Sequence, residues 1–151
     1  MNTVNALELV GTIVAASEKY HTALTPLRLQ AMLFFIQKES LWRRFMPAFN
    51  DDIYAWNYGP IVPDVYYKFS CYASTPIINV KEKEIDEELR GIIDFVVYRY
   101  SSIATWRLIK AMIKDKAYVN ARIRGNRVVR LEENNKTRRD LYGRHSAEEF
   151  L

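Results

Sequence analysis

Apolar positions recur at helical spacing through the first third of the chain. Over residues 5–20 they return every three or four positions, and Asn5 precedes Glu8 by three residues, the spacing of a capping box. A second apolar stripe runs over residues 26–45, where Thr25 offers a capping hydroxyl directly before a proline at the first helical position. The pattern therefore predicts two consecutive amphipathic helices.

The period changes after the second helix. Residues 53–58 are aromatic and rich in β-forming side chains, and a glycine–proline pair follows them. Residues 76–80 form another short apolar stretch, and between the two, residues 64–72 place apolar side chains at helical spacing. We therefore expect two short β segments, near 53–58 and 76–80, with a helix between them.

Helical periodicity returns in the second half of the chain. An apolar stripe runs over residues 84–100, and Ser102 stands where it could cap a further helix. Beyond Lys116 the pattern weakens. Residues 127–131 favour a strand, and residues 146–149 have the form of a capping box at the start of a short final helix.

Composition and length bound the fold class. The chain has 151 residues, of which 49% are hydrophobic and 26% are charged, as in globular proteins. Together with the predicted elements, this indicates a mainly α, compact single-domain helical fold. We expect residues 1–122 to form the helical domain and residues 123–151 a basic C-terminal extension, packed on the same domain or trailing from it.

Basic charge is concentrated near the C-terminus. From Arg122 to Arg144 the chain has eight basic and three acidic residues, a net charge of +5, against −1 for the remainder. Such a segment is typical of contact with nucleic acid or an acidic protein, and equally of a solvated tail of mixed charge. The arginines expected to make such contacts are Arg122, Arg124, Arg127, Arg130, Arg138 and Arg139.

The chain offers little of what catalysis requires. Its imidazoles are His21 and His145 and its one thiol is Cys71, and none stands in a motif that pairs a base with a nucleophile. The adjacent carboxylates of Asp51 and Asp52 could bind a metal ion, but such a pair before a strand is more typical of a cap or a turn. We therefore predict no enzymatic activity, no cofactor and no metal site.

Two further features bear on location. No apolar run reaches the roughly 18 residues that a membrane-spanning helix needs, and no basic stretch precedes an apolar one at the N-terminus. A single cysteine cannot form an internal disulfide. The sequence therefore predicts a cytoplasmic protein without membrane contact.

Aromatic and polar side chains are concentrated in residues 54–67. Trp and Tyr combine a large apolar area with a polar group, and both are enriched at the energetic centres of protein interfaces. For Trp56 itself the pattern favours an anchor in the core over a contact with a partner, with the following glycine and proline only turning the chain. The residues predicted to contact a partner are Tyr54, Trp56, Asn57, Tyr58, Gly59, Pro60, Tyr66 and Tyr67.

Two segments carry a resemblance to a known family. They are TPLRLQAMLFFIQ, over residues 25–37, and DIYAWNYGPIVPDVY, over residues 52–66. In this order and at this spacing they resemble the Panacea domain family, the SocA-like antitoxin and phage-associated group. A third family block aligns with residues 108–122, where Asp115 and Arg122 fit the family pattern and Tyr118 stands in place of its tryptophan.

The resemblance implies a small, mainly helical domain whose members neutralise toxins encoded beside them. Such antitoxins usually bind the toxin directly, and SocA-like members also deliver it to a protease. We therefore expect an antitoxin with a cognate protein toxin as its partner, and an adaptor role toward a cellular protease is compatible with that function. The alternative is a phage or mobile-element accessory protein that binds nucleic acid through its basic C-terminal segment.

Overall fold

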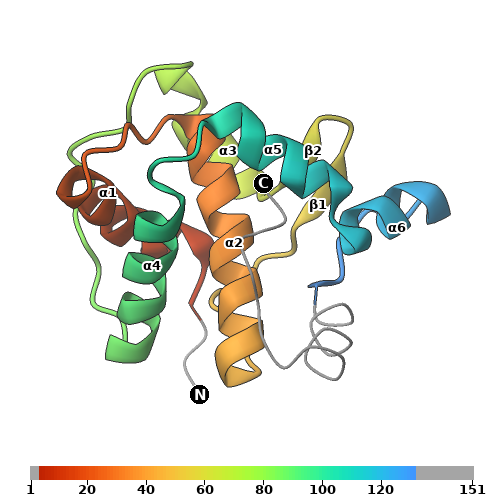
Figure 1. Ribbon diagram of the computed structural model, residues 1–151, viewed down its shortest axis with the longest axis horizontal. Helices are drawn as coiled ribbons and strands as arrows, with labels where there is room; N and C mark the ends of the chain where they lie inside the picture. Colours follow the sequence, from red (N-terminus) through yellow and green to blue (C-terminus); the bar gives the residue numbers. More distant parts are fainter. Residues whose placement is uncertain (1–3, 132–151) are drawn as a thin grey trace.

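Helix α2 (Pro26–Arg44) occupies the centre of the molecule, and the other elements pack around it (Figure 1). The computed structural model describes residues 4–131. In chain order the remaining elements are η1 (Ala6–Leu9), α1 (Val10–Lys19), β1 (Tyr54–Trp56), β2 (Gly59–Ile61), α3 (Pro63–Phe69), η2 (Ser70–Tyr72), α4 (Glu87–Tyr100), α5 (Thr105–Lys114) and α6 (Lys116–Arg124). The mainly α fold predicted from the sequence is confirmed.

The predicted starts of the first two helices are confirmed in atomic detail. Asn5 and Glu8 form a reciprocal capping box, in which each side chain accepts a hydrogen bond from the backbone N–H of the other. The Thr25 hydroxyl accepts from the N–H of Arg28 at 3.2 Å. Helix α2 ends at Arg44, close to the predicted end, because its C-cap residue Phe45 has a left-handed φ of 57°.

Two local predictions are wrong. Residues 76–80 form no strand, and in the described part of the chain the sheet consists of β1 and β2. Pro76 has no N–H to give to a ladder, and the segment is instead bound to the rest of the fold by the N–H of Ile77, which donates to Leu24 O at 2.8 Å. Ser102 caps no helix, because Ala104 occupies the N-cap position of α5.

The sequence pattern also misses helix α6. Its buried face consists of Ala117, Tyr118 and Ala121, a set too small and too polar to stand out as an apolar stripe. The helix is nevertheless well capped. The Asp115 carboxylate accepts from the N–H of Ala117 at 2.9 Å, and Gly125 ends the helix with a left-handed φ of 70°.

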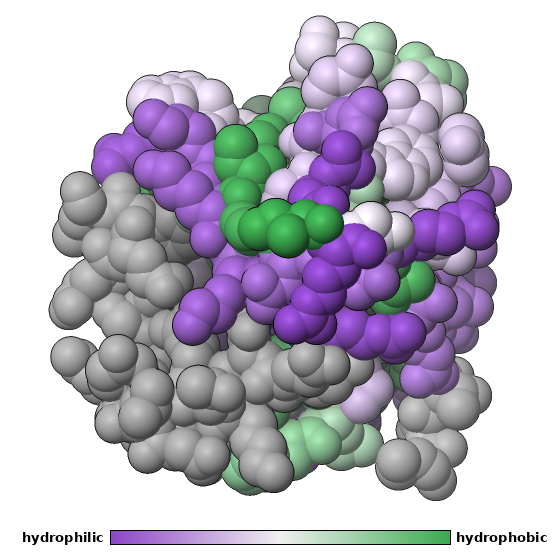
Figure 2. Space-filling model, turned by 90° about the vertical axis from the view of Figure 1, so that its right-hand side faces the viewer, coloured by the Kyte–Doolittle hydropathy of each residue, from purple (hydrophilic) through white to green (hydrophobic). Residues whose placement is uncertain are grey.

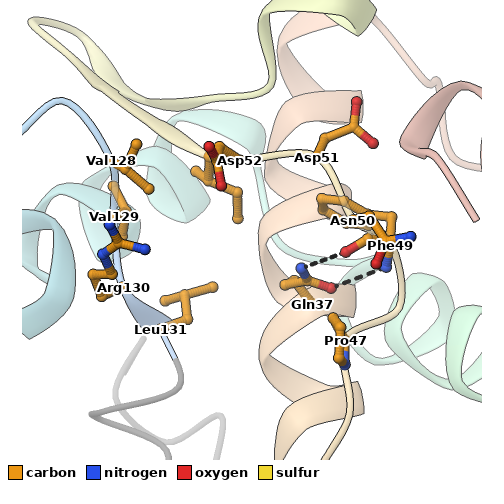
Figure 3. A pocket seen from close by; sticks show the side chains of 11 residues that line it. Gln37, Pro47, Phe49, Asn50, Asp51, Asp52, Val128, Val129, Arg130 and Leu131 are labelled. Carbon is orange, nitrogen blue, oxygen red and sulfur yellow. Dashed lines mark hydrogen bonds between the residues drawn. The ribbon is translucent and has the colours of Figure 1, made fainter. Parts of the chain in front are cut away.

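Two glutamines of α2 bind the backbone segments that cross this helix. The Gln37 side chain accepts from the N–H of Ala48 at 2.7 Å. It also donates to the carbonyl oxygen of Phe49 at 3.0 Å (Figure 3). Gln30 binds Val62 in the same way, accepting from its N–H at 2.8 Å and donating to its carbonyl oxygen at 3.2 Å. These bonds satisfy buried amides and fix both ends of the segment that carries the hairpin.

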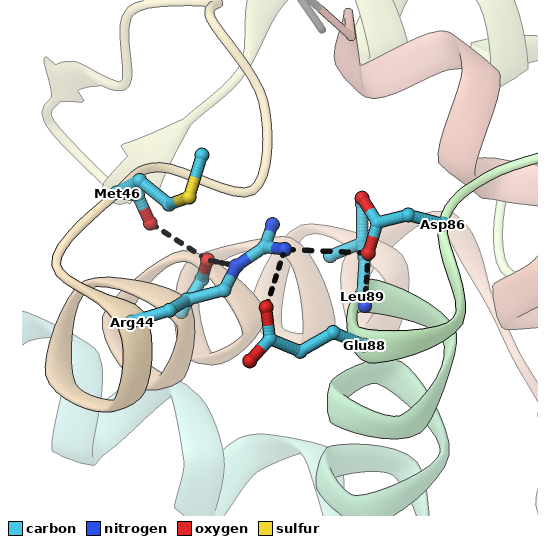
Figure 4. Close-up of polar contacts among 6 residues, drawn as sticks. Arg44, Met46, Asp86, Glu88 and Leu89 are labelled. Atoms are coloured by element: carbon cyan, nitrogen blue, oxygen red, sulfur yellow. Dashed lines mark hydrogen bonds and ion pairs between the residues drawn. The ribbon is translucent and has the colours of Figure 1, made fainter. Parts of the chain in front are cut away.

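Arginines near the two ends of α2 connect this helix to α4. Arg28 is buried, and its guanidinium donates to the carbonyl oxygens of Tyr100 and Ile103, where α4 ends. Burial lowers the pKa of Arg28 below its usual value. At the other end, Arg44 lies 3.4 Å from a carboxylate oxygen of Asp86, the N-cap residue of α4, and also contacts Glu88 (Figure 4).

Gly11 of α1 lies directly beneath the loop that leads to α4. A Cβ atom added to Gly11 would lie 2.2 Å from the carbonyl oxygen of Lys81 and 2.8 Å from the Cα of Glu82. We expect Gly11→Ala to lower the free energy of unfolding by about 2–3 kcal/mol, because backbone atoms of the loop would have to move off the helix. Urea unfolding followed by circular dichroism measures this loss.

Gly91→Ala is the matched control. Gly91 is exposed on α4, and nothing lies within 4 Å of the position of its Cβ. The same chemical change is therefore expected to raise the free energy of unfolding by about 0.5–1 kcal/mol through helix propensity alone. A stabilising effect of both substitutions would contradict the close approach at Gly11.

Candidate functional site

The β1–β2 hairpin projects from one side of α2, next to α5 and α6 (Figure 1). Its strands pair antiparallel, with Ala55 opposite Pro60 and Trp56 opposite Gly59. Gly59 has a φ of +143°, a conformation that residues with a side chain rarely adopt, so a glycine is needed at this turn. The hairpin confirms the β segment predicted near 53–58 and supplies its partner strand.

Three aromatic side chains of the hairpin and α3 pack against one another. Trp56 contacts Tyr66 with ring centroids 5.2 Å apart, and Tyr66 contacts Tyr67 at 5.4 Å, both edge to face. Trp56 is half-buried and both tyrosines are exposed, so this group is not part of the core. Tyr58 lies at the hairpin turn with 86% of its surface exposed. We call Trp56, Tyr58, Tyr66 and Tyr67 the aromatic surface.

The remaining residues of the predicted contact set are less accessible. Gly59 and Pro60 are buried and are therefore not accessible to a partner. Tyr54 is half-buried and forms a β-bridge with Val128. Asn57 is exposed, but its side-chain oxygen already accepts a hydrogen bond from Arg122 at 2.7 Å.

Helix α6 holds the hairpin in place through hydrogen bonds from its side chains. The hydroxyl of Tyr118 donates to the carbonyl oxygen of Trp56 at 2.6 Å, and the guanidinium of Arg122 donates to the carbonyl oxygen of Ala55 at 2.9 Å. A half-buried backbone carbonyl without a donor would be costly, so these bonds fix the position of the first strand. The hydrogen bonds from Tyr118 and Arg122 thus join the hairpin to a helix that lies about 60 residues later in the sequence.

The position of α6 is in turn fixed by α2. The ammonium group of Lys38 lies 2.6 Å from the carboxylate of Asp115, and both side chains are almost fully buried. Because Asp115 also caps α6, the ion pair joins the start of that helix to the central helix. Sequence reasoning missed Lys38, since a single lysine on an apolar helix gives no signal of its partner.

The predicted strand at residues 127–131 lies along the outer edge of β1. The N–H of Ala55 donates to Arg127 O at 2.8 Å, and the N–H of Val129 donates to Ile53 O at 2.8 Å. The pairing is limited to one isolated bridge, between Tyr54 and Val128. Residues 127–129 are therefore bound to the backbone of β1 and of the residue before it.

Exposed cations lie on α5, on α6 and on the segment after α6, next to the hairpin. Arg122, Arg124, Arg127 and Arg130 are all exposed, whereas Arg138 and Arg139 lie outside the described residues. The structure adds four exposed cations that the sequence count did not include, because they precede Arg122 in the chain. We call the whole set the basic surface: Arg107, Lys110, Lys114, Lys116, Arg122, Arg124, Arg127 and Arg130.

Two pockets adjoin the hairpin. One, of about 160 Å³, lies between the loop after α2 and residues 128–131 (Figure 3). Asp51 at its edge accepts from the N–H of Ala6 at 2.7 Å and so acts as a cap, in agreement with the structural interpretation of this carboxylate. The other pocket, of about 350 Å³, lies between β1 and the end of α6, and Arg122 and Arg127 contribute to its lining.

Residues 4–131 also bear on metal binding and on membrane insertion. In that range no three His, Cys, Asp or Glu residues are grouped as a metal ion would require. None of its helices combines the length and the apolar character needed to cross a bilayer.

Comparison with known proteins gives one match. The family model described as Antitoxin SocA-like, Panacea domain, matches residues 29–119, which is more than half of the chain. The matched range contains the hairpin, the aromatic surface and both partners of the Lys38–Asp115 ion pair. No curated protein and no solved structure matches the chain.

Proposed function

The chain belongs to the SocA-like Panacea antitoxin family, and on this basis we propose that it is the antitoxin of a toxin–antitoxin pair. In this proposal it neutralises a toxin encoded by an adjacent gene through direct protein–protein binding. The observation that carries the proposal is the aromatic surface, held on a hairpin that α6 supports by hydrogen bonds.

Large, rigid aromatic side chains suit protein recognition. Tyr and Trp provide contact area at a low cost in side-chain entropy, and they dominate the binding energy of many interfaces. Tyr58 and Tyr67 expose 86% and 66% of their surface and therefore contribute little to the core. Their exposure supports a role in contact with another molecule.

We also propose that the chain acts by binding and not by catalysis. Neutralisation would then follow from covering the functional groups of the toxin. The polar groups beneath the aromatic surface support this view, because Tyr118 and Arg122 are engaged in holding the hairpin. Their bonds favour a rigid binding surface over one that rearranges during a reaction.

Co-expression tests the proposal directly. The adjacent reading frame is placed under an inducible promoter, alone and together with this chain, and growth and co-purification are measured. Growth arrest by the neighbour alone, with rescue and co-purification when this chain is present, is the expected result. A neighbour that is harmless when expressed alone would contradict the antitoxin function.

The tyrosines of the aromatic surface provide a sharper test. We expect Tyr58→Ala and Tyr67→Ala each to weaken binding to the neighbouring gene product about tenfold or more, while the thermal midpoint changes little because both side chains are exposed. Tyr98→Ala is the matched control, since Tyr98 is 62% exposed but lies on α4. Titration calorimetry measures the affinities, and equal affinities for all three variants would place the interface elsewhere.

A protease adaptor role is a separate proposal that the same strains can test. If the chain delivers its toxin to a protease, the toxin's half-life after translation arrest should shorten when the chain is present. An unchanged half-life together with growth rescue would indicate neutralisation by binding alone.

A further inference from the structure

The charge of the described chain is strongly divided between two regions. Residues 105–131 contain eight lysines and arginines, all exposed, and a single carboxylate, Asp115. Residues 4–104 contain ten basic and twelve acidic side chains. The net charges are therefore +7 and −2, and the positive charge is concentrated at the end of the molecule that carries α6.

Several of these cations have no ionic partner within residues 4–131. Asp115 is already paired with Lys38, and Arg122 is bound to the hairpin. Lys116, Arg124 and Arg127 make no ion pair or side-chain hydrogen bond with any residue that the structure describes. Like charges at this density repel one another, so an external set of anions would be bound favourably.

The basic surface is interrupted by exposed apolar side chains. Ile123 exposes 77% of its surface, between two arginines of α6. Ile113 of α5 is also exposed, and its Cγ2 lies only 3.7 Å from the position that a Cβ of Gly59 would take, so it lies beside the hairpin turn. Figure 2 shows this end of the molecule, with apolar atoms near the centre of a largely hydrophilic surface.

A pocket joins the basic surface to the hairpin. Its volume is about 350 Å³, and its lining includes Trp56 from the aromatic surface together with Arg122 and Arg127. Arg122 is held in place by its bonds to Ala55 and Asn57, whereas the guanidinium of Arg127 has no partner among the described residues. A carboxylate entering this pocket would meet a cation that is free to donate.

We propose that the toxin contacts this chain through an acidic protein surface, which covers the basic surface and places a carboxylate in the pocket beside Arg127. This inference rests on the proposed antitoxin function and specifies the chemistry of its partner. The apolar contacts come from the aromatic surface and from Ile113 and Ile123. The cations attract and orient the partner, as charged groups at interfaces commonly do.

The apolar side chains favour a protein over a nucleic acid as the partner. Interfaces with nucleic acid are strongly polar, and a phosphate backbone would leave Ile123 without an apolar contact. Tyr66 packs edge to face against both Trp56 and Tyr67, and the rings of Trp56 and Tyr67 are tilted by 55°, which restricts the ring faces on which bases could stack.

Charge reversal tests the proposal. The variant Arg124→Glu/Arg127→Glu is compared with Lys81→Glu/Lys83→Glu, which changes the net charge equally at exposed positions in the loop before α4. Binding to the purified product of the adjacent gene is followed by surface plasmon resonance at 50 and 300 mM NaCl, and thermal midpoints confirm that both variants fold. A random 20-base-pair DNA duplex is the second probe.

The expected result is an association rate constant about tenfold or more lower for the arginine variant, with the lysine variant within about twofold of the wild type. The wild-type rate should also fall with salt. Unchanged binding by the arginine variant would overturn the inference and leave the antitoxin proposal intact. If the arginine variant lost binding to the DNA duplex but kept its binding to the protein, the basic surface would be assigned to nucleic acid. If the wild-type chain neither bound nor neutralised the neighbouring protein, both proposals would be overturned.

Discussion

Replacing Arg28 with alanine is expected to lower the free energy of unfolding by about 4 kcal/mol. The guanidinium is buried and donates to the carbonyl oxygens of Tyr100 and Ile103 and to the hydroxyl of Thr105, at 2.9 and 3.0 Å for the last two. The substitution would remove these three hydrogen bonds and would create a cavity between α2, the end of α4 and the start of α5. Urea unfolding followed by circular dichroism measures the loss.

Two variants separate the role of Arg28 from the loss of any arginine. Arg124→Ala removes an exposed guanidinium without an internal partner among the described residues, so a change within about 0.5 kcal/mol is expected. Arg28→Lys keeps the charge but cannot reproduce the planar set of donors, and its stability should lie between those of the wild type and Arg28→Ala. If Arg28→Ala were as stable as the wild type, the hydrogen bonds of Arg28 would make no net contribution to the free energy of unfolding.

The second large effect is expected at Lys38. We expect Lys38→Met to lower the free energy of unfolding by about 3 kcal/mol, because it removes a largely buried ammonium group that lies 2.6 Å from the Asp115 carboxylate. Adding Asp115→Asn to this variant should recover part of the loss, since asparagine removes the charge and can still cap α6. Denaturant unfolding of the single and double variants gives the coupling energy.

An exposed ion pair provides the control for Lys38. Lys19 and Asp94 lie 3.2 Å apart, with 61% and 39% of their side chains exposed, against 11% and 7% for Lys38 and Asp115. Because water screens the exposed pair, Lys19→Met should change stability far less than Lys38→Met does. If Lys19→Met and Lys38→Met lowered the free energy of unfolding equally, burial of the ion pair would not determine its contribution to stability.

The Lys38 variant also connects stability to the proposed function. Lys38 fixes Asp115, Asp115 caps α6, and Tyr118 of α6 holds the carbonyl oxygen of Trp56. A weakened ion pair should therefore loosen the hairpin that carries the aromatic surface. Of these residues, the family alignment pointed to Asp115 and to position 118, and nothing in the sequence pointed to Lys38.

Local signals account for the elements that the sequence predicted well. Asn5 with Glu8, and Thr25 before a proline, act within one turn of helix, so the residues that form these caps are also neighbours in the sequence. The first strand of the hairpin was predicted for a related reason, since a glycine–proline pair restricts the backbone locally. That pair lies in β2, however, so the second strand was not predicted. Where the signal depended on apolar pattern alone, as at residues 76–80 and in α6, the prediction failed.

The sequence by itself therefore determined the helical fold, the starts of its first two helices and the resemblance that leads to the family. Only the tertiary structure decided that Gln30 and Gln37 bind crossing backbone segments, that Arg28 bridges two helices, and that Tyr118 supports the hairpin. The physical reason is that a buried polar group must find a partner, but the partner is chosen by proximity in space. Surface charge follows the same rule, since the cations of α5 join those of α6 only when the chain has folded.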